Sequence, residues 1–441
     1  MKNLDQLYLD YVKSTEELFQ KFELLEIIRY SLFKDLIIDR KKMGIRKRMK
    51  SFLRPLKSLY NSNSNYKKYD IILCVESDRE VITDIVMPIY NHLKKIGSSV
   101  GVILDREKVG SKENFMILDR KYNYFVPNWS GEAYNTLKVA METKTQPDHS
   151  LFQEYCKQIT DLASSVNYML DIVQPKVIVT VSRTMPISAA ITVLGKKKKI
   201  RTIELQHGIP QAFYTPLISD NFISWGQISK NILTDLGEDP SKIFNLGSPR
   251  HDDLTSSLKS KNEIFKELNL KKIPTLVFFS NGNDLSRNGN APIECAYWIN
   301  DLSRKFYNRM NIIVKLHPNE DGQLYVNNSD ITILKNEYSS AELLNICNYS
   351  ASYCSTVMYE SILFEKPVIQ FYDSNWPDLA DNWKSGLAIR ASSIDNLNEI
   401  FDKVLKNDLK LSVNNEMINK LFQNVGNSIS KVANHIIKEF N

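Results

Sequence analysis

Two short motifs in the C-terminal half of the chain hold residue types that can bind a phosphate group. Lys315-Leu316-His317-Pro318 ends one run of apolar residues, and Ser355-Thr356 follows another. An imidazole can donate a hydrogen bond to a phosphate oxygen, and an ammonium group adds positive charge. Hydroxyl and free backbone N–H groups at the start of a helix also favour an anion. The two motifs together predict a site for a phosphorylated ligand.

The same residues also have structural interpretations. His317 would then be an exposed histidine at a capped strand end, and Ser355 or Thr356 would only cap the next helix. Two carboxylates nearby are similarly open to two interpretations. Glu360, in the helical stretch after the hydroxyl pair, and Glu337, before another helix, could accept hydrogen bonds from ribose or complement a helix dipole. We prefer Glu360 as the ribose ligand because it lies beside the hydroxyl pair.

A third motif, in the N-terminal half, predicts acid–base chemistry. The segment Glu204-Leu205-Gln206-His207-Gly208-Ile209-Pro210 includes the end of an apolar strand and the turn after it. Gly208 and Pro210 force a tight turn, which aims His207 away from the sheet. A neutral imidazole can take a proton from an acceptor hydroxyl. Glu204 is a competing base or an orienter of the histidine, and the alternative to both roles is a structural turn.

Two further segments hold candidate ligand residues. Gly247-Ser248-Pro249-Arg250-His251-Asp252 combines a permissive glycine, a proline of fixed φ and a guanidinium group suited to phosphate or carboxylate. We interpret this segment mainly as a hinge. Arg250 could contact a ligand, or it could be only part of the hinge. Glu76-Ser77-Asp78 ends the first predicted strand, where it would help to hold an acceptor or cap the following helix.

The elements that must position these residues form two sets of short apolar runs. The runs alternate with longer amphipathic stretches, which is typical of βα units with a parallel sheet. The first set lies at 70–75, 100–104, 122–126, 176–182, 200–205 and 222–225, and the second at 275–280, 311–316, 331–334, 351–355, 367–372 and 386–389. Two doubly wound domains are therefore predicted, with the polar motifs at the carboxyl ends of their strands, where such sheets bind ligands.

The remaining segments predict how the domains are bounded. Apolar residues at helical spacing, without Pro or Gly, fill 4–39 and predict helix. We expect a helical extension at 1–60, an N-terminal Rossmann-like acceptor domain at 66–250, a C-terminal Rossmann-like nucleotide-donor domain at 264–415 and a closing amphipathic helix at 416–441.

The positive charge of the chain is concentrated in one segment. The net charge is +6, yet Arg40 to Lys57 holds nine basic residues and no acidic one, so acidic residues are in excess elsewhere. Apolar residues interleave with these charges, and such a segment could lie on an anionic membrane surface. The alternative is a solvated linker. Nucleic acid is not expected as a partner because the aromatic residues of a base-stacking surface are sparse.

Several chemistries lack their usual signals in this sequence. Five scattered cysteines without a C-x-x-C spacing predict buried thiols rather than disulfides or a zinc site. There is no phosphate loop, dinucleotide fingerprint or H-E-x-x-H pair, so we expect a reaction with no metal and no cofactor. With no long apolar segment and no signal-peptide core, the expected location is cytoplasmic, with possible peripheral attachment to the inner face of the plasma membrane.

Taken together, the motifs resemble the GT-B glycosyltransferase superfamily of bacterial surface-polymer synthesis. The agreement is with CDP-glycerol glycerophosphotransferases, which show a His-Gly-x-Pro turn, a Gly-x-Pro-Arg-x-Asp segment and a Ser-Ser or Ser-Thr turn before a Lys/Arg-Pro strand. This chain has QHGIP at 206–210, GSPRHD at 247–252 and STVMYE through KPVIQFYD at 355–373. Lys-x-His-Pro followed by a hydroxyl pair is also similar to the CMP-sugar sialyl- and Kdo-transferases of capsule synthesis.

The resemblance implies a fold of two Rossmann-like domains facing a crevice and a role for each motif. His207 would be the general base, His317 with Ser355 and Thr356 would bind the donor phosphate, and Glu360 or Glu337 would bind the ribose. Two departures concern the substrate. Tyr353-Cys354 stands where the family usually has Asp-Tyr, and the lysines that often follow the His-Gly turn are missing.

Three functions remain open at this point. The first is transfer of a sugar or sugar-like group from a nucleotide donor, of CMP or CDP type in preference to UDP, onto a lipid-linked or oligosaccharide acceptor of capsule, lipopolysaccharide or a similar polymer. The second is a UDP-N-acetylglucosamine 2-epimerase-like reaction, which shares the fold and needs no acceptor. The third is a non-catalytic binding or assembly protein, because fold alone never fixes chemistry.

Overall fold

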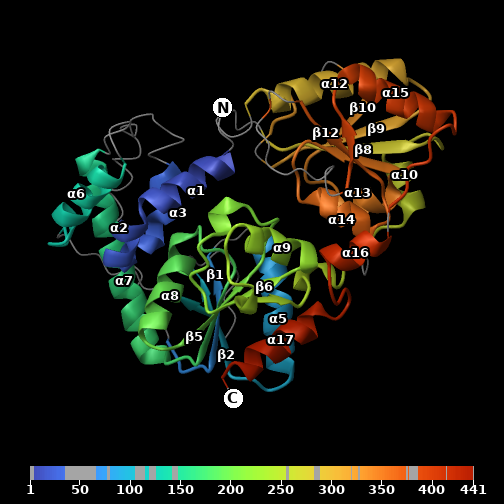
Figure 1. Ribbon diagram of the computed structural model, residues 1–441. Helices are drawn as coiled ribbons and strands as arrows, with labels where there is room; N and C mark the ends of the chain where they lie inside the picture. The colour runs from blue at the N-terminus through green and yellow to red at the C-terminus, as the bar shows by residue number, and fades with distance from the viewer. Residues whose placement is uncertain are drawn as a thin grey trace. The chain divides into compact units, whose positions relative to one another are not determined.

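The computed structural model divides the chain into two compact units (Figure 1). The first unit comprises Leu4–Asp252 and Phe422–Asn441, and the second comprises Asp253–Leu421. The structure describes residues 4–34, 66–76, 80–104, 115–118, 126–141, 148–254, 258–282, 289–318, 320–325, 328–373, 376, 386–413 and 415–440. The basic segment Arg40 to Lys57 lies outside the described residues, as does the predicted strand at 122–126 except for Val126.

The first unit is built on a seven-stranded parallel sheet in the order β3-β2-β1-β4-β5-β6-β7. Its strands are β1 (Ile71–Val75), β2 (Val100–Leu104), β3 (Phe115–Ile117), β4 (Val177–Thr180), β5 (Arg201–Leu205), β6 (Asn221–Ser224) and β7 (Ile243–Asn245). The central strand β1 pairs Ile71 with Val100 on one side and with Val177 on the other. All five residues of β1 are buried, as expected of a parallel strand covered on both faces.

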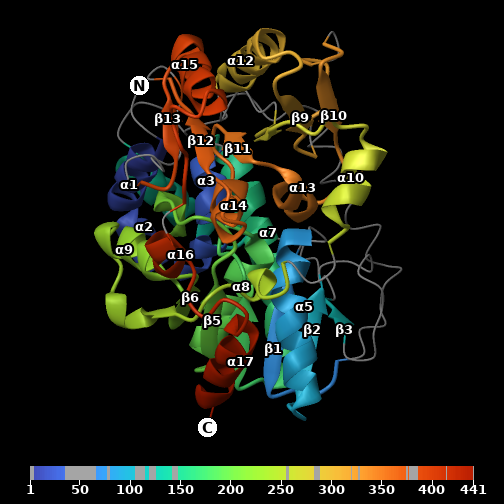
Figure 2. The ribbon, with the colours of Figure 1, turned by 90° about the vertical axis from the view of Figure 1, so that its right-hand side faces the viewer.

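Helices cover both faces of this sheet. Ile71, Leu73 and Val75 share one hydrophobic cluster with α5 (Glu80–Lys95) and α17 (Ser428–Lys438), which lie side by side (Figure 2). The alternate residues Ile72 and Cys74 share another cluster with two further helices. Those helices are α7 (His149–Val173) and α8 (Pro186–Lys197). Further helices of the unit are α6 (Ser130–Ala140), α9 (Gln227–Asp235) and the short 3-10 turns η3 (Ala212–Tyr214), η4 (Pro240–Lys242) and η5 (Pro249–His251).

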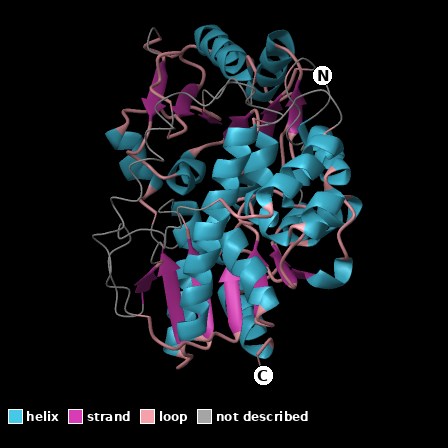
Figure 3. Ribbon diagram, turned by 90° about the vertical axis from the view of Figure 1, so that its left-hand side faces the viewer, coloured by secondary structure: helices cyan, strands magenta, loops and turns pink. Residues whose placement is uncertain are grey.

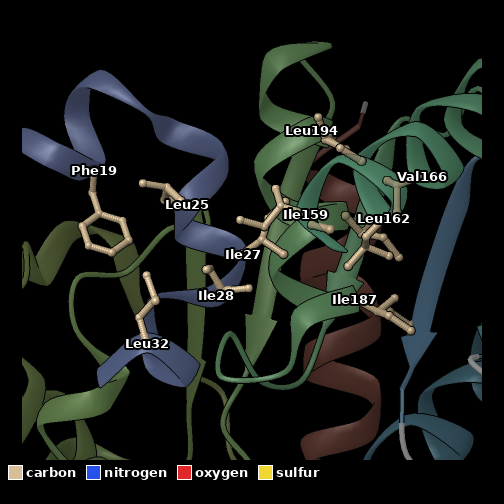
Figure 4. Packing of buried hydrophobic residues seen from close by; sticks show 14 of the residues in the cluster. Phe19, Leu25, Ile27, Ile28, Leu32, Ile159, Leu162, Val166, Ile187 and Leu194 are labelled. Carbon is tan, nitrogen blue, oxygen red and sulfur yellow. The ribbon is translucent and has the colours of Figure 1, made fainter. Parts of the chain in front are cut away.

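The N-terminal residues form four short helical pieces that belong to this unit. They are α1 (Leu4–Ser14), α2 (Glu16–Lys21), the 3-10 helix η1 (Glu23–Ile28) and α3 (Arg29–Phe33). Leu25, Ile27 and Ile28 lie beside α7 and α8 in one cluster, facing residues such as Ile159 and Leu194 (Figure 4). The expected extension is thus part of the core of the first unit, because its apolar residues complete the cover on one face of the sheet.

The second unit has a six-stranded parallel sheet in the order β10-β9-β8-β11-β12-β13. Its strands are β8 (Thr275–Phe279), β9 (Asn311–Lys315), β10 (Ile331–Leu334), β11 (Tyr349–Ser352), β12 (Val368–Phe371) and β13 (Ile389–Ala391). Its helices are α10 (Lys261–Glu267), α12 (Ala291–Lys305), α13 (Ser340–Ile346), α14 (Val357–Leu363), α15 (Ile394–Leu405) and α16 (Asn415–Leu421). Figure 3 shows the strands and helices of the chain coloured by type.

Both sheets are doubly wound, which confirms the predicted α/β class with two Rossmann-like units. In each sheet the first three strands in the chain are added one after another toward one edge of the sheet. The later strands are added toward the opposite edge. The order therefore reverses between β1 and β4 in the first unit, and between β8 and β11 in the second. Ligands of open α/β sheets bind at the carboxyl ends of the strands at this reversal.

The C-terminal residues return to the first unit through contacts with the GSPRHD segment. Asp252 accepts hydrogen bonds from the backbone N–H groups of Ser428 at 3.0 Å and Ile429 at 2.7 Å, and so caps α17. Gly247 has φ of +95°, and a Cβ there would lie 2.2 Å from Ser428 Oγ. Only a glycine fits this approach. Within the part of the chain that the structure describes, no helix has the length and apolar character needed to cross a membrane.

Candidate active site

Three polar segments follow adjacent strands of the second unit at the reversal of its sheet. Ser280-Asn281-Gly282 follows the first strand β8, the segment at His317 follows β9, and Ser355-Thr356 follows β11 after one further turn. The segment after β8 lies at the centre of the sheet and was not predicted from the sequence. Hydrogen bonds from this central segment organise both of its neighbours.

Asn281 fixes the turn that leads to the hydroxyl pair. Its side-chain oxygen accepts from Ser352 Oγ at 2.9 Å and from the backbone N–H of Cys354 at 3.1 Å. Its side-chain amide donates to the carbonyl oxygen of Cys354. The single hydrogen of Ser352 Oγ is shared with the carbonyl oxygen of Phe279, which lies 2.7 Å away. One asparagine thus joins the ends of β8 and β11, immediately before Ser355.

Ser280 and Gly282 fix the backbone and surroundings of His317. The backbone N–H of His317 donates to Ser280 Oγ at 2.7 Å, and the Ser280 hydroxyl donates to the carboxylate of Glu320, which is buried. Gly282 has φ of +84°, and a Cβ there would lie 3.1 Å from His317 Nδ1. The imidazole therefore lies against backbone that has no side chain, and the glycine allows this close approach.

The hydroxyl pair begins α14 as expected. Ser355 Oγ accepts from the backbone N–H of Val357 at 3.3 Å, so this hydroxyl caps the helix. Thr356 is half-buried and makes no side-chain capping bond. Glu360 lies one turn further along α14 with only 4% of its surface exposed. The structural role predicted for Ser355 is present, while Thr356 is the hydroxyl that remains available to a ligand.

Lys315 and Glu337 come together in a turn of their own. The Lys315 ammonium donates to the carbonyl oxygens of Lys335 and Tyr338, the latter at 2.7 Å. The exposed Glu337 accepts from the backbone N–H of Lys335 at 2.5 Å. The backbone N–H groups of this turn, its own first, lower the pKa of Glu337, and the charge of Lys315 adds to the effect. Both side chains thus stabilise the turn between β10 and α13.

In the first unit, His207 directly follows Gln206 at the end of β5 and contacts Tyr214. The two rings stack with centroids 5.4 Å apart and planes 20° apart, and Tyr214 Oη lies 3.1 Å from His207 Nδ1. The side chain of Gln206 fixes this turn. Its amide N–H donates to the Gly208 carbonyl at 2.8 Å, and its oxygen accepts from the backbone N–H of Trp225 at 2.7 Å. The histidine is half-buried, so its ring is oriented by the protein and still reaches the surface.

Glu204 lies in β5 beneath this turn and is almost completely buried. Its Oε1 accepts from the backbone N–H of Arg183 at 3.0 Å. Burial raises the pKa of Glu204 to about 7, against the opposing effects of the Arg183 backbone N–H and guanidinium. Tyr214 makes the contact with the His207 ring that Glu204 was expected to make as an orienter. Glu204 is a buried carboxyl group whose pKa burial raises well above its ordinary value.

Arg183 follows β4, at the reversal of the first sheet, and belongs to a buried charge cluster. Its guanidinium donates to Glu26 of η1 at 3.2 Å and to the carbonyl oxygen of Pro216. Arg29 Nε donates to the same Glu26 carboxylate at 2.8 Å. The side chains of Arg183 and Arg29 are 3% and 4% exposed. One carboxylate from the N-terminal helices thus bridges two buried guanidinium groups.

The other predicted residues of the first unit have structural contacts. Glu76 accepts from the backbone N–H groups of Ile187 at 2.9 Å and Ser188 at 2.8 Å, and so caps α8 rather than the helix that follows it. Ser77 and Asp78 lie outside the described residues. His251 is buried between the rings of Trp225 and Phe422. Arg250 is half-buried in η5 beside it.

All five cysteines are free, and four of them are buried, which confirms the prediction of buried thiols. Among the described residues, no group of three or more His, Cys, Asp or Glu side chains is arranged to hold a metal ion.

Comparisons with known proteins extend this description of the fold and of the strand ends. The sequence pattern of the CDP-Glycerol:Poly(glycerophosphate) glycerophosphotransferase family matches residues 132–382, more than half of the chain. The chain belongs to this family of transferases. The match includes the turns at His207, His317 and Ser355. No curated protein matches the chain.

Solved structures share the fold at low sequence identity. UDP-GlcNAc 2-epimerase from Neisseria meningitidis, bound to UDP-GlcNAc, has 14% identity and a TM-score of 0.55 over 83% of this chain and 99% of its own. A putative UDP-N-acetylglucosamine 2-epimerase from Listeria monocytogenes has 12% identity and a TM-score of 0.57 over 85% and 97%. HepE from Anabaena, in complex with UDP and glucose, has 11% identity and a TM-score of 0.51 over 84% and 98%. These likenesses establish the fold alone.

Proposed function

We propose that this protein transfers a glycerophosphate or a sugar-like group from a cytidine-nucleotide donor onto a bacterial cell-surface polymer. The family match over residues 132–382 carries this proposal, because it spans the histidine turn of the first unit and the phosphate-type turns of the second. Within that range we favour CDP-glycerol as donor and a poly(glycerophosphate)-type chain as acceptor. Tyr353-Cys354, at the position of the usual Asp-Tyr, is where donor preference would depart from the family.

We propose that the donor binds at the reversal of the second sheet. His317 and Thr356 would donate hydrogen bonds to phosphate oxygens, and Gly282 would let the imidazole of His317 lie close to the backbone. Asn281 would hold the two turns in register. Glu360 remains the proposed ribose ligand, because it lies one turn along α14 from the hydroxyl pair. Lys315 would then support the donor site through its bonds to the turn between β10 and α13.

We propose that His207 handles the proton of the acceptor. With CDP-glycerol, an acceptor hydroxyl oxygen would form a bond to the phosphorus that carries glycerol. The bond from that phosphorus to the bridging oxygen would break, CMP would leave with the electron pair, and the hydroxyl proton would pass to His207. That step requires a lone pair on a ring nitrogen of His207 and uses no metal ion.

The two histidines separate the two halves of the proposal experimentally. His207→Gln should lower kcat for transfer by about 10²- to 10⁴-fold with little change in KM for the donor, since general acid–base catalysis is lost. His317→Gln should raise the KM for the donor by roughly 10- to 100-fold, because a hydrogen bond to a charged oxygen is removed.

The matched control is His149→Gln, at an exposed position at the start of α7. It should leave both constants unchanged. The proposal is wrong if the His207 and His317 variants transfer as fast as the control on the same donor and acceptor.

A further inference from the structure

The Tyr214 hydroxyl forms hydrogen bonds with the turn that contains His207 and Gly208. Its oxygen accepts from the backbone N–H of Gly208 at 3.2 Å. Burial, and then the charge of Glu204, raise the pKa of Tyr214, so the phenol keeps its hydrogen at any physiological pH. Only 2% of the residue is exposed, and water does not compete for these bonds.

Counting donors and acceptors fixes the direction of the bond to His207. A phenol has one hydrogen and two lone pairs, and the backbone N–H of Gly208 uses one lone pair. Among the described residues, His207 Nδ1, 3.1 Å away, is the acceptor within hydrogen-bond distance of this hydrogen. If Nδ1 carried a hydrogen instead, the phenol hydrogen would lose its acceptor in a buried position, which costs about 1–3 kcal/mol.

We propose that Tyr214 holds His207 in the tautomer that carries its hydrogen on Nε2. In the resting protein Nδ1 then accepts from Tyr214, and Nε2 is a hydrogen-bond donor. Tyr214 is a positioning residue that acts through the histidine. This assignment concerns the protein alone, whereas its meaning for catalysis rests on the proposed function.

For catalysis, the consequence is that the hydrogen on Nε2 keeps this nitrogen of the proposed base from accepting a proton. Nε2 can accept a proton from an acceptor hydroxyl only after its own hydrogen has been released and one has been placed on Nδ1, with the Tyr214 hydroxyl turned away. The number of protons on the ring is the same before and after that exchange. Until then Nε2–H suits an anionic ligand oxygen, such as one on a phosphate group.

The loop that carries Tyr214 is held from outside the site by the N-terminal helices. Asp5 of α1 accepts from the backbone N–H of Ala212 at 3.1 Å, and the ring of Tyr30 lies 5.5 Å from that of Phe213. On the other side, the guanidinium of Arg183 donates to the carbonyl oxygen of Pro216. The hydroxyl therefore has a fixed place relative to the imidazole.

Nitrogen NMR of the ring tests the proposal without any substrate. The full-length protein is labelled with ¹⁵N-histidine, and His207→Gln identifies the His207 signals among those of the six histidines. Above the pH at which the ring is protonated, we expect Nε2 in the hydrogen-bearing range and Nδ1 in the hydrogen-free range. A wild-type spectrum with the hydrogen on Nδ1 overturns the proposal by itself.

Tyr214→Phe supplies the second arm of the test. Removing the hydroxyl should shift both His207 nitrogens toward values averaged over the two tautomers, with the other five histidines unchanged as evidence of folding. Tyr90→Phe, at a buried tyrosine of α5, is the matched control and should leave His207 unmoved. Unchanged His207 signals in a folded Tyr214→Phe protein would contradict the proposal.

Transfer kinetics distinguish this inference from the proposed function. Tyr214→Phe should change kcat and the pH profile of kcat while leaving KM for the donor within about twofold. If no donor and acceptor support transfer but the nitrogen pattern is as expected, the proposed function fails and the tautomer assignment stands. If transfer occurs and the hydrogen lies on Nδ1, the tautomer assignment fails and the proposed function stands.

Discussion

At the residue scale, the catalytic candidates depend on buried neighbours that have no motif of their own. His207 and His317 could be predicted because each ends an apolar run and lies in a Gly- or Pro-defined turn. The role of Asn281 could not be predicted. Its side chain joins β8 to Cys354, which is 73 positions away, and a local sequence pattern does not indicate a contact over that separation. Tyr214 was missed for a related reason. Its hydroxyl matters only because the turn brings it back to the ring of His207.

The raised pKa of Glu204, in β5, makes the free energy of unfolding depend on pH. Its pKa is raised to about 7 from 4.5, so the native state holds a proton that the unfolded chain has released. The stabilisation is present below pH 4.5 and is lost as the pH rises through 7, by about 3 kcal/mol in all. Glu204→Gln, which cannot ionise, should lose less stability between pH 5 and pH 8. Urea unfolding at the two pH values measures the difference, and equal losses in both proteins would contradict the assignment.

Asn281 should matter to both stability and nucleotide binding. Asn281→Ala removes its bonds to Ser352 and to the backbone N–H and C=O of Cys354, which should cost about 1–3 kcal/mol. The thermal shift produced by CMP or CDP should fall as well, since binding to the native state would weaken. Asn434→Ala, at an exposed position of α17, is the control. The role given to Asn281 fails if both variants respond alike.

At the scale of elements, continuous apolar runs located most strands because both faces of each sheet are covered. The strands β3 and β7 have three residues each, too few to give a pattern, and β11 and β13 are displaced by two or three residues from the predicted runs. The helical spacing of 4–39 predicted helix but could not show its division into short pieces. Those breaks let Glu26 and Asp5 reach the turns of the first unit, which only the tertiary structure reveals.

The charge cluster around Glu26 should make these helices a large contributor to stability. Glu26→Gln keeps the shape of the side chain but removes the carboxylate that bridges Arg29 and Arg183, and breaking a buried pair costs about 3–5 kcal/mol. Glu132→Gln breaks an exposed pair with Lys21 and should cost less than about 1 kcal/mol. Denaturant unfolding compares the two. Similar losses would mean that the cluster does not join the N-terminal helices to the sheet.

At the scale of the whole molecule, the two doubly wound units were predictable because each has its own set of alternating strands and helices. The assignment of the chain ends was not. The sequence suggested an extension at one end and a separate closing helix at the other, whereas α1 to α3 and α17 all pack on the first unit. Apolar periodicity shows that a helix is buried but not which sheet it covers.

The basic segment from Arg40 to Lys57, outside the described residues, supports a proposal about the membrane. If it lies on anionic lipid, replacing Arg46, Lys47, Arg48 and Lys50 by glutamine should remove about 1 kcal/mol of binding per charge. Four charges correspond to a fall of about 10³-fold in partitioning onto phosphatidylserine vesicles. Sedimentation with these vesicles measures it, with neutral phosphatidylcholine vesicles as control. Equal binding of both proteins to the anionic vesicles would remove the proposal.

The most direct test of the central claim is acceptor-dependent release of nucleotide. The purified protein is incubated with CDP-glycerol, with a CMP-sugar or with UDP-N-acetylglucosamine, each with and without a poly(glycerophosphate) acceptor. The account predicts CMP release from CDP-glycerol only when the acceptor is present, with one group added to the acceptor for each CMP. Isomerisation of the UDP-sugar without acceptor, or no acceptor-dependent release from any of the three donors, would contradict it.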